Sequence, residues 1–317
     1  MIDVVALGEL LIDFAMERAD EAGCPTMTAH PGGAPANFLA ALAKFGRRTA
    51  LMGKVGSDKF GRLLCDTLKT AGIETSGLIA ADDVFTTLAF VTLDETGDRE
   101  FSFARKPGAD TCIRFEELDL SLIDRAKVFH FGTLSLTDEP ARSATVQAVA
   151  YAREKGKLIT FDPNLRKPLW KDLETAKQQT LWGLSCADVV KISDEEVEFF
   201  FGLNPREGAK HILEDYGVKL VFVTCGADGC YFSNGKAMGH VPGLSGIRVV
   251  DTTGAGDIFG GSVVHKLLEA GKSPDMMTDD ELYTAVRFAC VSAGLSTTRA
   301  GGISSVPEYE DVIRRMG

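Results

Sequence analysis

The protein has 317 residues, of which 45% are hydrophobic and 25% are charged, so it holds enough apolar material for a sizeable core. Its formal net charge is -11 and no run of Lys or Arg exceeds the pair Arg47-Arg48, which argues against binding to nucleic acid or to anionic membranes. The first residues carry no basic segment with a cleavage site and no apolar stretch is as long as a membrane span, so we expect a cytoplasmic protein with a small-molecule partner.

Short β-branched runs alternate with helical patterns along most of the chain. Between two of these runs, Phe38, Ala41, Leu42 and Phe45 share one apolar helix face. This rhythm predicts an α/β fold with a mainly parallel sheet and helices on both faces. The runs predicted as strands are Val4–Leu7, Ala50–Val55, Val128–Phe131, Leu158–Phe161, Val189–Ile192 and Leu220–Thr224.

Two segments break the rhythm. Thr86–Leu93 and Arg99–Phe103 flank the turn Asp94–Asp98 without room for a helix, which predicts a β-hairpin projecting from the sheet. A second hairpin is expected where Gly229–Phe232 and Ala237–Val241 flank a turn of four residues. Because there is no internal repeat and no long linker, we expect a single domain over residues 1–317 with a small β accessory.

The seven cysteines and five histidines follow no ligand or disulfide pattern. The cysteine count is odd and no C-x-x-C pair occurs, which argues against a disulfide framework or a structural zinc site. No H-E-x-x-H or comparable histidine spacing is present. We therefore expect reduced cysteines and no transition metal.

The most informative segment, Val249–Gly261, reads as a strand end, a turn of small residues and an amphipathic helix. Gly254, Ala255 and Gly256 carry almost no side chain, so their backbone N–H groups can surround an anion at the helix N-terminus. Asp257 falls in the first helical turn, where its carboxylate can accept a proton from a hydroxyl that attacks phosphorus. This combination predicts phosphoryl transfer with Asp257 as the base, while a helix-capping acid after a tight turn is the alternative.

Two better-known nucleotide motifs do not fit these residues. Gly254-x-Gly256 is followed by Gly260 instead of a glycine at position 259, and G-x-x-x-x-G-K-[ST] does not occur. The sequence therefore supports neither a dinucleotide-binding fingerprint nor a P-loop.

The run Asp251–Asp257, D-T-T-G-A-G-D, resembles the C-terminal signature of the ribokinase-like (PfkB) sugar kinases. Pro31–Asn37 and Gly53–Gly61 resemble the N-terminal signature, and the motifs stand in the right order over nearly the whole chain. The resemblance implies a ribokinase-like three-layer α/β/α sandwich and Mg-ATP as the phosphoryl donor. It also implies a small β lid over the sugar, with strands approximately within residues 12–30 and 86–106.

Four positions near the N-terminus have the chemistry of a sugar site. Asp13 follows the first predicted strand, at the edge of the sheet where ligands of open α/β folds bind, although a turn or capping acid would also fit there. Gly32 and Gly33 would let the backbone approach a sugar, and Asn37 offers a donor and an acceptor. The resemblance implies that these positions bind the substrate.

Two arginines follow strand-like runs. Arg105 comes after the predicted hairpin, and Arg166 closes the segment Asp162–Arg166 after a buried strand. Both can face the pocket as fixed cations, or pair with acids at the surface. The resemblance implies that both arginines and Asn164 lie near the substrate or the ATP phosphates.

The segment Lys191–Glu196 resembles the family's N-x-x-E element, in which the glutamate helps to organise Mg²⁺ and its waters. Ser193 replaces the usual asparagine. The resemblance implies that Lys191, Ser193 and Glu196 lie beside the nucleotide. Ser193 and Glu196 also fit a capping box that begins a helix, and this interpretation is compatible with the first.

Two further elements resemble the nucleotide side of the family's site. Val223–Gly229 is similar to a T-x-G-x-x-G turn beside the ATP phosphates and ribose, which would use Thr224, Gly226 and Gly229, although a bare hairpin turn also explains the glycines. The helix around Cys290 would lie against adenine. Positions that hold a monovalent cation, K⁺, in many relatives match Asp251, Thr253, Ser296, Arg299, Gly301 and Ser305.

The opening Gly8–Asp13 and the segments Arg105–Asp110, Asp162–Arg166 and Lys191–Glu196 resemble fructokinases more than ribokinases or nucleoside kinases. The leading reaction is phosphorylation of D-fructose to fructose 6-phosphate by ATP. A 2-keto-3-deoxygluconate kinase is the alternative, because two arginines can pair with a carboxylate substrate. A non-catalytic sugar-binding or nucleotide-binding regulatory relative is the alternative from another class.

The hairpin also predicts an assembly. Its apolar residues Phe90, Val91, Phe101 and Phe103 can meet those of a second lid, so we expect a homodimer.

Overall fold

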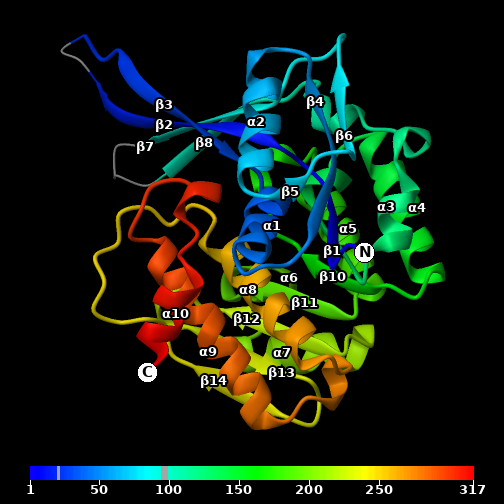
Figure 1. The fold of residues 1–317 in the computed structure, drawn as a ribbon, viewed down its shortest axis with the longest axis vertical. Helices are drawn as coiled ribbons and strands as arrows, with labels where there is room; N and C mark the ends of the chain where they lie inside the picture. The colour runs from blue at the N-terminus through cyan, green and yellow to red at the C-terminus, as the bar shows by residue number, and fades with distance from the viewer. Residues whose placement is uncertain (20–21, 94–98) are drawn as a thin grey trace.

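The computed structural model describes residues 1–19, 22–93 and 99–317. The predicted turn Asp94–Asp98 lies outside the described residues. A large, mostly parallel sheet with helices around it forms the body, and a smaller sheet projects from one end (Figure 1). This arrangement confirms the predicted α/β fold class.

The large sheet contains ten strands in the order β14-β13-β12-β11-β10-β9-β1-β4-β5, with β6 also paired to β4. The six strands predicted from apolar runs are confirmed. Within this sheet only the pairs β12–β13 and β13–β14 are antiparallel, and the second of these is the expected hairpin. Its strands are β1 (Val4–Leu7), β4 (Thr49–Gly56), β5 (Ile73–Glu74), β6 (Leu78–Ala81), β9 (Val128–Gly132), β10 (Leu158–Asp162), β11 (Val189–Ser193), β12 (Leu220–Thr224), β13 (Cys230–Ser233) and β14 (Met238–Val241).

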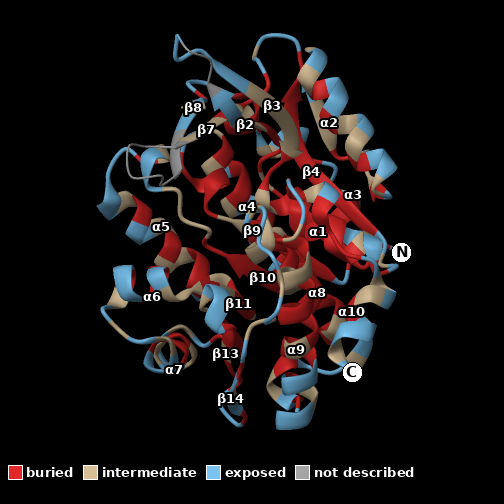
Figure 2. Ribbon diagram, turned by 90° about the vertical axis from the view of Figure 1, so that its left-hand side faces the viewer, coloured by how far each residue is buried: buried red, intermediate tan, exposed pale blue. Residues whose placement is uncertain are grey.

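Helices cover both faces of this sheet, and each face has its own buried apolar cluster. Buried residues therefore fill the centre of the molecule, while the outer helix faces are exposed (Figure 2). One face is covered by α1 (Ala34–Lys44), α2 (Lys59–Thr70), α8 (Ala255–Ala270), α9 (Asp279–Ser296) and α10 (Tyr309–Met316). The other is covered by α3 (Leu120–Arg125), α4 (Ala141–Glu154), α5 (Leu173–Cys186), α6 (Asp194–Phe201) and α7 (Pro205–Tyr216).

The smaller sheet has the order β3-β2-β7-β8. It consists of β2 (Leu11–Ala19), β3 (Pro25–Gly32), β7 (Leu88–Leu93) and β8 (Arg99–Ala104). Within each of the pairs β2–β3 and β7–β8 the strands are antiparallel, and β2 and β7 join the pairs in parallel. Phe14 of β2 stacks on Phe90 of β7 with ring centroids 5.4 Å apart, which supports this junction.

Local chemistry explains where the helices near the site begin. Asp58 accepts hydrogen bonds from the amides of Phe60 and Gly61 and so caps α2. Gly254 begins α8 in the left-handed region, with φ of 75°, which strongly favours glycine. No helix of the described residues is both long and apolar enough to cross a membrane.

Candidate active site

The predicted base lies where α8 begins, against helix α1. A Cβ atom on Gly261 of α8 would lie 2.4 Å from the carbonyl oxygen of Phe38, so only glycine lets the two helices pack this closely. This contact brings Asn37, in the first turn of α1, beside Asp257. The pairing of two residues 220 positions apart in the chain thus depends on glycine at the helix crossing.

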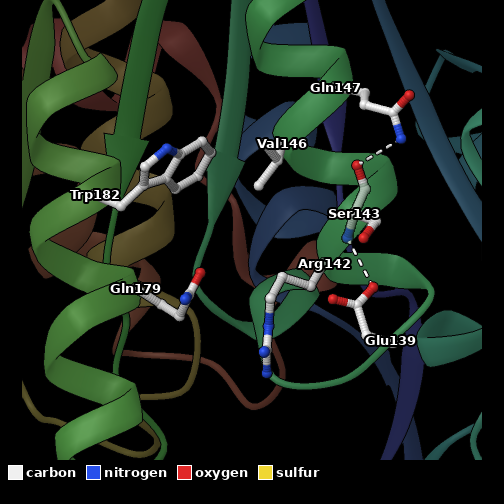
Figure 3. Close-up of a pocket in the computed structure, with 7 residues that line it drawn as sticks. All are labelled: Glu139, Arg142, Ser143, Val146, Gln147, Gln179 and Trp182. Atoms are coloured by element: carbon white, nitrogen blue, oxygen red, sulfur yellow. Dashed lines mark hydrogen bonds between the residues drawn. The ribbon is translucent and has the colours of Figure 1, made fainter.

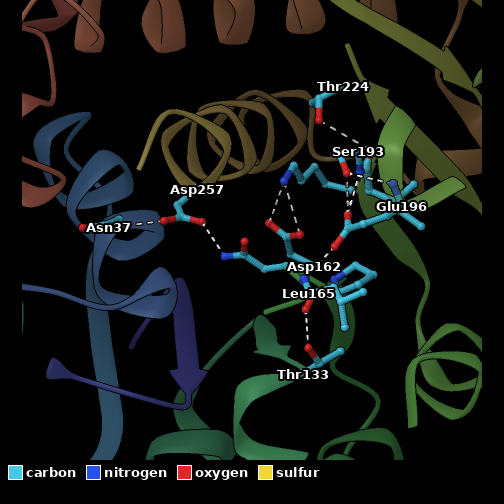
Figure 4. A network of polar contacts seen from close by, with 12 residues as sticks. Asn37, Thr133, Asp162, Leu165, Ser193, Glu196, Thr224 and Asp257 are labelled. Carbon is cyan, nitrogen blue, oxygen red and sulfur yellow. Dashed lines mark hydrogen bonds and ion pairs between the residues drawn. The ribbon is translucent and has the colours of Figure 1, made fainter. Parts of the chain in front are cut away.

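Asp257 is buried, and two side-chain amides hold its carboxylate. Nδ2 of Asn37 donates to Oδ2 at 2.9 Å, and Nδ2 of Asn164 donates to Oδ1 at 3.0 Å (Figure 4). Burial raises the pKa of Asp257, while the two amides and the cations Lys191 and Arg166 oppose that rise. The carboxylate is thus fixed in position and is a stronger base than an exposed aspartate.

Asn37 is enclosed by two glycine turns. A Cβ on Gly302 would lie 2.2 Å from its Oδ1, and a Cβ on Gly254 would lie 3.1 Å from its Nδ2. Within the described residues, Oδ1 of Asn37 is buried and accepts no hydrogen bond. A buried acceptor without a donor is unusual and marks a place where a ligand hydroxyl can bind.

A buried ion pair lies on the other side of the helix start. Nζ of Lys191 contacts Oδ2 of Asp162 at 3.1 Å and Oδ1 at 3.3 Å. Burial disfavours the charged ammonium, but the carboxylates of Asp162, Glu196 and Asp257 outweigh it and raise the pKa of Lys191. A Cβ on Gly256 would lie 2.9 Å from Nζ, so the ammonium stands next to the predicted anion site.

The amides of that site are not all equivalent. The N–H of Ala255 donates to the carbonyl oxygen of Thr252 at 3.3 Å, which occupies one of the predicted donors. The first N–H groups of an α-helix have no partner within the helix, so the start of α8 retains donors for an anion.

Glu196 is the third residue of α6 and forms, with Ser193, the capping box proposed for it. Its Oε2 accepts from the amide and hydroxyl of Ser193 at 2.8 and 3.0 Å, and the amide of Glu196 donates back to the Ser193 hydroxyl at 3.2 Å. Its Oε1 accepts from the amide of Leu165 at 2.7 Å. These bonds fix the carboxylate beside the segment that carries Asn164 (Figure 4).

Asp13, on β2 of the small sheet, faces the same group of charges. Burial raises the pKa of Asp13 to about 7, the carboxylates of Asp257 and Asp251 contribute, and Arg166 opposes the rise. No described residue donates a hydrogen bond to its carboxylate. A Cβ on Gly32 would lie 2.4 Å from Oδ2, so only glycine on β3 leaves this side chain in place.

Of the two predicted arginines, the structure brings only Arg166 into the group. Its Nη1 donates to Oδ1 of Asn164 at 2.7 Å, so the arginine orients the amide that holds Asp257. Arg105 is instead buried and hydrogen-bonded to Asp110, Thr137 and Leu134. Its guanidinium is not a free cation facing the site, because protein groups already occupy it.

The segments predicted to hold a monovalent cation meet through Asp251. Its Oδ1 accepts from the amide and hydroxyl of Thr253, and its Oδ2 accepts from the amide of Gly301 at 2.9 Å. Ser296 and Ser305 donate to the carbonyl oxygens of Ala293 and Gly302. Arg299 lies in the same connection, where its amide donates to the carbonyl of Ser296.

The predicted nucleotide turn follows β12. Thr224 ends that strand, and Gly226 and Gly229 have φ of 52° and 99°, the region that favours glycine. A Cβ on Gly229 would lie 2.0 Å from the carbonyl oxygen of Val241, so the turn lies tightly against β14. Cys290 is buried in α9, on the face of the large sheet that α1 and α8 also cover.

The predicted site residues include neither Asp162 nor Glu9 and Asp110, two buried acids at the base of the small sheet. Asp162 ends a predicted buried strand, and its position at the carboxyl end of a parallel strand was the available signal. Nothing local distinguished Glu9 or Asp110.

Two surface hollows lie elsewhere and contain none of the predicted site residues. One, of about 410 Å³, lies between α4 and α5, where Arg142 and Ser143 face Gln179 and Trp182 (Figure 3). The other, of about 480 Å³, includes Arg48, Lys69 and Arg125 at the opposite ends of the strands.

Comparison with known proteins identifies the family. Residues 1–309 match the model of the pfkB family carbohydrate kinases. The chain belongs to this family. As a pfkB carbohydrate kinase, it is a phosphotransferase that acts on a sugar hydroxyl.

Similar proteins of this kinase family cover nearly its full length. It is 40% identical over 316 residues to fructokinase-2 of Solanum habrochaites, covering 98% of this chain and 94% of that protein. It is 39% identical over 315 residues to fructokinase-1 of Zea mays, covering 98% and 96%.

Solved structures of similar folds include two fructokinases. That of Xylella fastidiosa with bound ATP has a TM-score of 0.91 and 30% identity, covering 100% of this kinase and 98% of that chain. That of Vibrio cholerae O395, in a form that binds fructose, ADP and calcium, has a TM-score of 0.88 and 31% identity, covering 100% and 99%. These neighbours agree with the ribokinase-like fold that the motifs implied.

Proposed function

We propose that the protein is a fructokinase that transfers the γ-phosphoryl group of ATP to the terminal hydroxyl of D-fructose, forming fructose 6-phosphate. The observation that carries this proposal is the carboxylate of Asp257, held by Asn37 and Asn164 at the start of α8. The substrate is proposed from relatives at about 40% identity over nearly the whole chain, which are named fructokinases, and from the fructose-bound neighbour.

In this reaction Asp257 accepts the proton of the attacking hydroxyl as its oxygen bonds to the γ-phosphorus. The bond between that phosphorus and the bridging oxygen of ADP breaks, and ADP leaves. The N–H groups at the start of α8 stabilise negative charge on the transferring group, and the ammonium of Lys191 stands beside them. Asp13 would accept hydrogen bonds from sugar hydroxyls and so orient the ketose.

The nucleotide would lie along the turn after β12, against Thr224, Gly226 and Gly229. Cys290 of α9 would lie beside adenine. Mg²⁺ binds proteins through one or two carboxylates plus substrate phosphates and waters. Glu196 fits that role through water, because protein donors already fix both of its oxygens. When bound, the ion neutralises charge on the ATP phosphates.

A monovalent cation would bind where Asp251 joins the two loops at residues 251–253 and 296–305. We expect K⁺ to raise turnover by ordering the turn before α8, which replacement of K⁺ by choline would test.

The small sheet would act as a lid, because it carries Asp13 over the site. Pairing of two such lids in a homodimer remains a prediction. The molar mass in solution, measured by light scattering as the protein elutes from a size-exclusion column, would test it. We also place the enzyme in the cytoplasm, where thiols such as those of Cys65 and Cys230 stay reduced.

The test is ADP release from Mg-ATP with D-fructose, 2-keto-3-deoxygluconate, ribose, glucose and adenosine, with Asp257→Asn as the control. Turnover that depends on fructose and is lost in the variant supports the proposal. Turnover confined to the keto-acid would make Arg166 its carboxylate ligand. Binding of sugar and nucleotide without any turnover would identify a regulatory relative.

A further inference from the structure

The first strand pair of the small sheet is joined at its base by one buried carboxylate. β2 begins at Leu11, two residues after Glu9, and β3 ends at Gly32, two residues before Ala34. Oε1 of Glu9 accepts a hydrogen bond from the amide of Ala34 at 2.8 Å. Glu9 is only 3% exposed, so one carboxylate ties together the two points where this strand pair meets the body.

The second strand pair has the same arrangement. Thr87 precedes β7 and Arg105 follows β8. The hydroxyl of Thr87 donates to Oδ1 of Asp110, and Nε of Arg105 donates to Oδ2 at 2.8 Å. A second carboxylate, from outside the sheet, therefore ties the two ends of this pair.

Arg105 connects the second pair to the body. Its Nη2 donates to the carbonyl oxygen of Leu134 and its Nη1 to the hydroxyl of Thr137, both at 2.8 Å, in the connection that follows β9. The side chains of Arg105 and Asp110 are each 2% exposed. Glu9 is coupled to both, since Asp110 adds to a pKa that burial raises to about 7 and Arg105 opposes it.

Three buried side chains lie at these connections, and we call them the root cluster: Glu9, Arg105 and Asp110. A Cβ on Gly108 would lie 1.8 Å from the hydroxyl of Thr87 and 2.9 Å from Oδ1 of Asp110. Removing one partner from a buried ion pair leaves the other charge uncompensated. The root cluster is therefore a rigid joint between the small sheet and the body.

We infer that the root cluster positions the small sheet, and with it Asp13, at the correct height over Asp257. Asp13 is the third residue of β2, four positions after Glu9, so a shift at the base moves this carboxylate directly. Glu9, Arg105 and Asp110 are thus positioning residues and contact no substrate. This inference rests on the proposed sugar kinase activity and gives Arg105 a role other than that of a substrate ligand.

The test measures three variants: Asp110→Asn, Arg105→Lys and the double variant that combines these two changes. Asp311→Asn is the control. Asp311 pairs with Arg314 at 3.0 Å on the exposed face of α10, so this control removes an Arg–Asp pair that belongs neither to the site nor to the root cluster. Arg105→Lys keeps the charge but loses the planar fork that contacts three groups.

We expect kcat/KM for the sugar to fall on the order of 10²-fold in both single variants, because small misplacements of reacting groups have effects of that size. KM for ATP should stay within about twofold of the wild-type value. In the double variant, kcat/KM for the sugar should be no lower than in the less active single variant, since both changes break one joint. Asp311→Asn should match the wild type. A merely structural loss would impair the use of sugar and of ATP together, so that kcat/KM would fall for both substrates.

Two kinetic outcomes would overturn the inference. Loss of activity in Arg105→Lys with wild-type behaviour in Asp110→Asn would make Arg105 a substrate ligand. Additive losses in the double variant would show that the two residues act separately. If Asp110→Asn does not fold, Thr87→Val removes a single hydroxyl from the joint and is measured in the same way.

Hydrogen exchange of the wild type and Asp110→Asn, without substrate, tests the joint independently of activity. Amides at residues 88–92 and 102–104 should exchange faster in the variant, while those of β9–β12 should not change. A wild type that turns over no sugar would defeat the proposed function and leave this measurement valid. Equal exchange in both proteins would defeat the inference.

Discussion

Asp257 in the body and Asp13 on the small sheet are the two carboxylates proposed to meet the sugar, and they are held in opposite ways. Asp257, in the body, receives two amide hydrogen bonds and lies on a helix packed against its neighbour through glycine. The carboxylate of Asp13, on the small sheet, receives no hydrogen bond from the described residues. The fold thus completes the surroundings of one acid and leaves the other without donors.

This difference fits two roles. A general base must be oriented before the hydroxyl arrives, so fixed donors on both oxygens suit Asp257. A carboxylate that binds sugar gains its donors from the sugar, and until then its burial raises the pKa of Asp13 to about 7. The following predictions test whether the two acids are as different as their surroundings.

The largest effect is expected for the base. Asp257→Asn keeps the shape of the side chain but cannot accept the proton, so kcat should fall by a factor of about 10² to 10⁴. Calorimetric titration with sugar and nucleotide should give dissociation constants close to those of the wild type. Wild-type turnover in this variant would remove Asp257 from the role of base.

A smaller effect, on sugar alone, is expected for the second carboxylate. Asp13→Asn weakens charge-assisted hydrogen bonds of about 1.5–3 kcal/mol each, so kcat/KM for the sugar should fall about tenfold to hundredfold. KM for ATP should not change, because Asp13 lies on the small sheet. Equal losses for sugar and ATP would show that Asp13 supports the structure instead.

The body also contains a buried histidine that links acidity to stability. His130 of β9 stacks on Phe38 at 3.8 Å between ring centroids and bonds the Thr160 hydroxyl, and burial, with Lys191, lowers its pKa to about 3. Below pH 6.5 the unfolded chain binds a proton that the folded protein does not, so this contribution to stability falls as the pH drops towards 3. At pH 5 the loss is about 2 kcal/mol.

Denaturant titrations of the wild type and His130→Gln at pH 7.5 and pH 5 measure this term. Between pH 7.5 and pH 5 the variant should lose about 2 kcal/mol less stability than the wild type. The exposed His240→Gln should behave like the wild type. A wild-type pH dependence in His130→Gln would contradict the assignment.

The sequence predicted the body better than it predicted the contacts of the site. Continuous apolar runs identify buried parallel strands, and Gly254 with Asp257 marks the start of a helix, because these signals are local. The bonds from Asn37 and Asn164 to Asp257 span 220 and 93 positions, which no local pattern encodes. The contacts of Arg105 were out of reach for the same reason, since its partner Leu134 lies 29 positions away, in the body.

The smallest effect is expected when the base loses one of its two donors. Asn164 takes a φ of 45°, uncommon for a residue other than glycine, and this geometry aims its amide at Asp257 while Arg166 holds its oxygen. In Asn164→Ala the carboxylate loses one hydrogen bond, so its pKa should rise and kcat at neutral pH should fall about threefold to tenfold.

The pH profile separates this effect from a general disturbance. Because a base with a higher pKa stays protonated to a higher pH, the acidic limb of the kcat profile should move towards alkaline pH, and activity should recover at the alkaline end. Asn204→Ala, which removes the cap of α7 instead, should lower stability without moving the limb. An unmoved limb in Asn164→Ala would mean that Asn37 alone fixes the base, and that the body holds its carboxylate less completely than its two hydrogen bonds indicate.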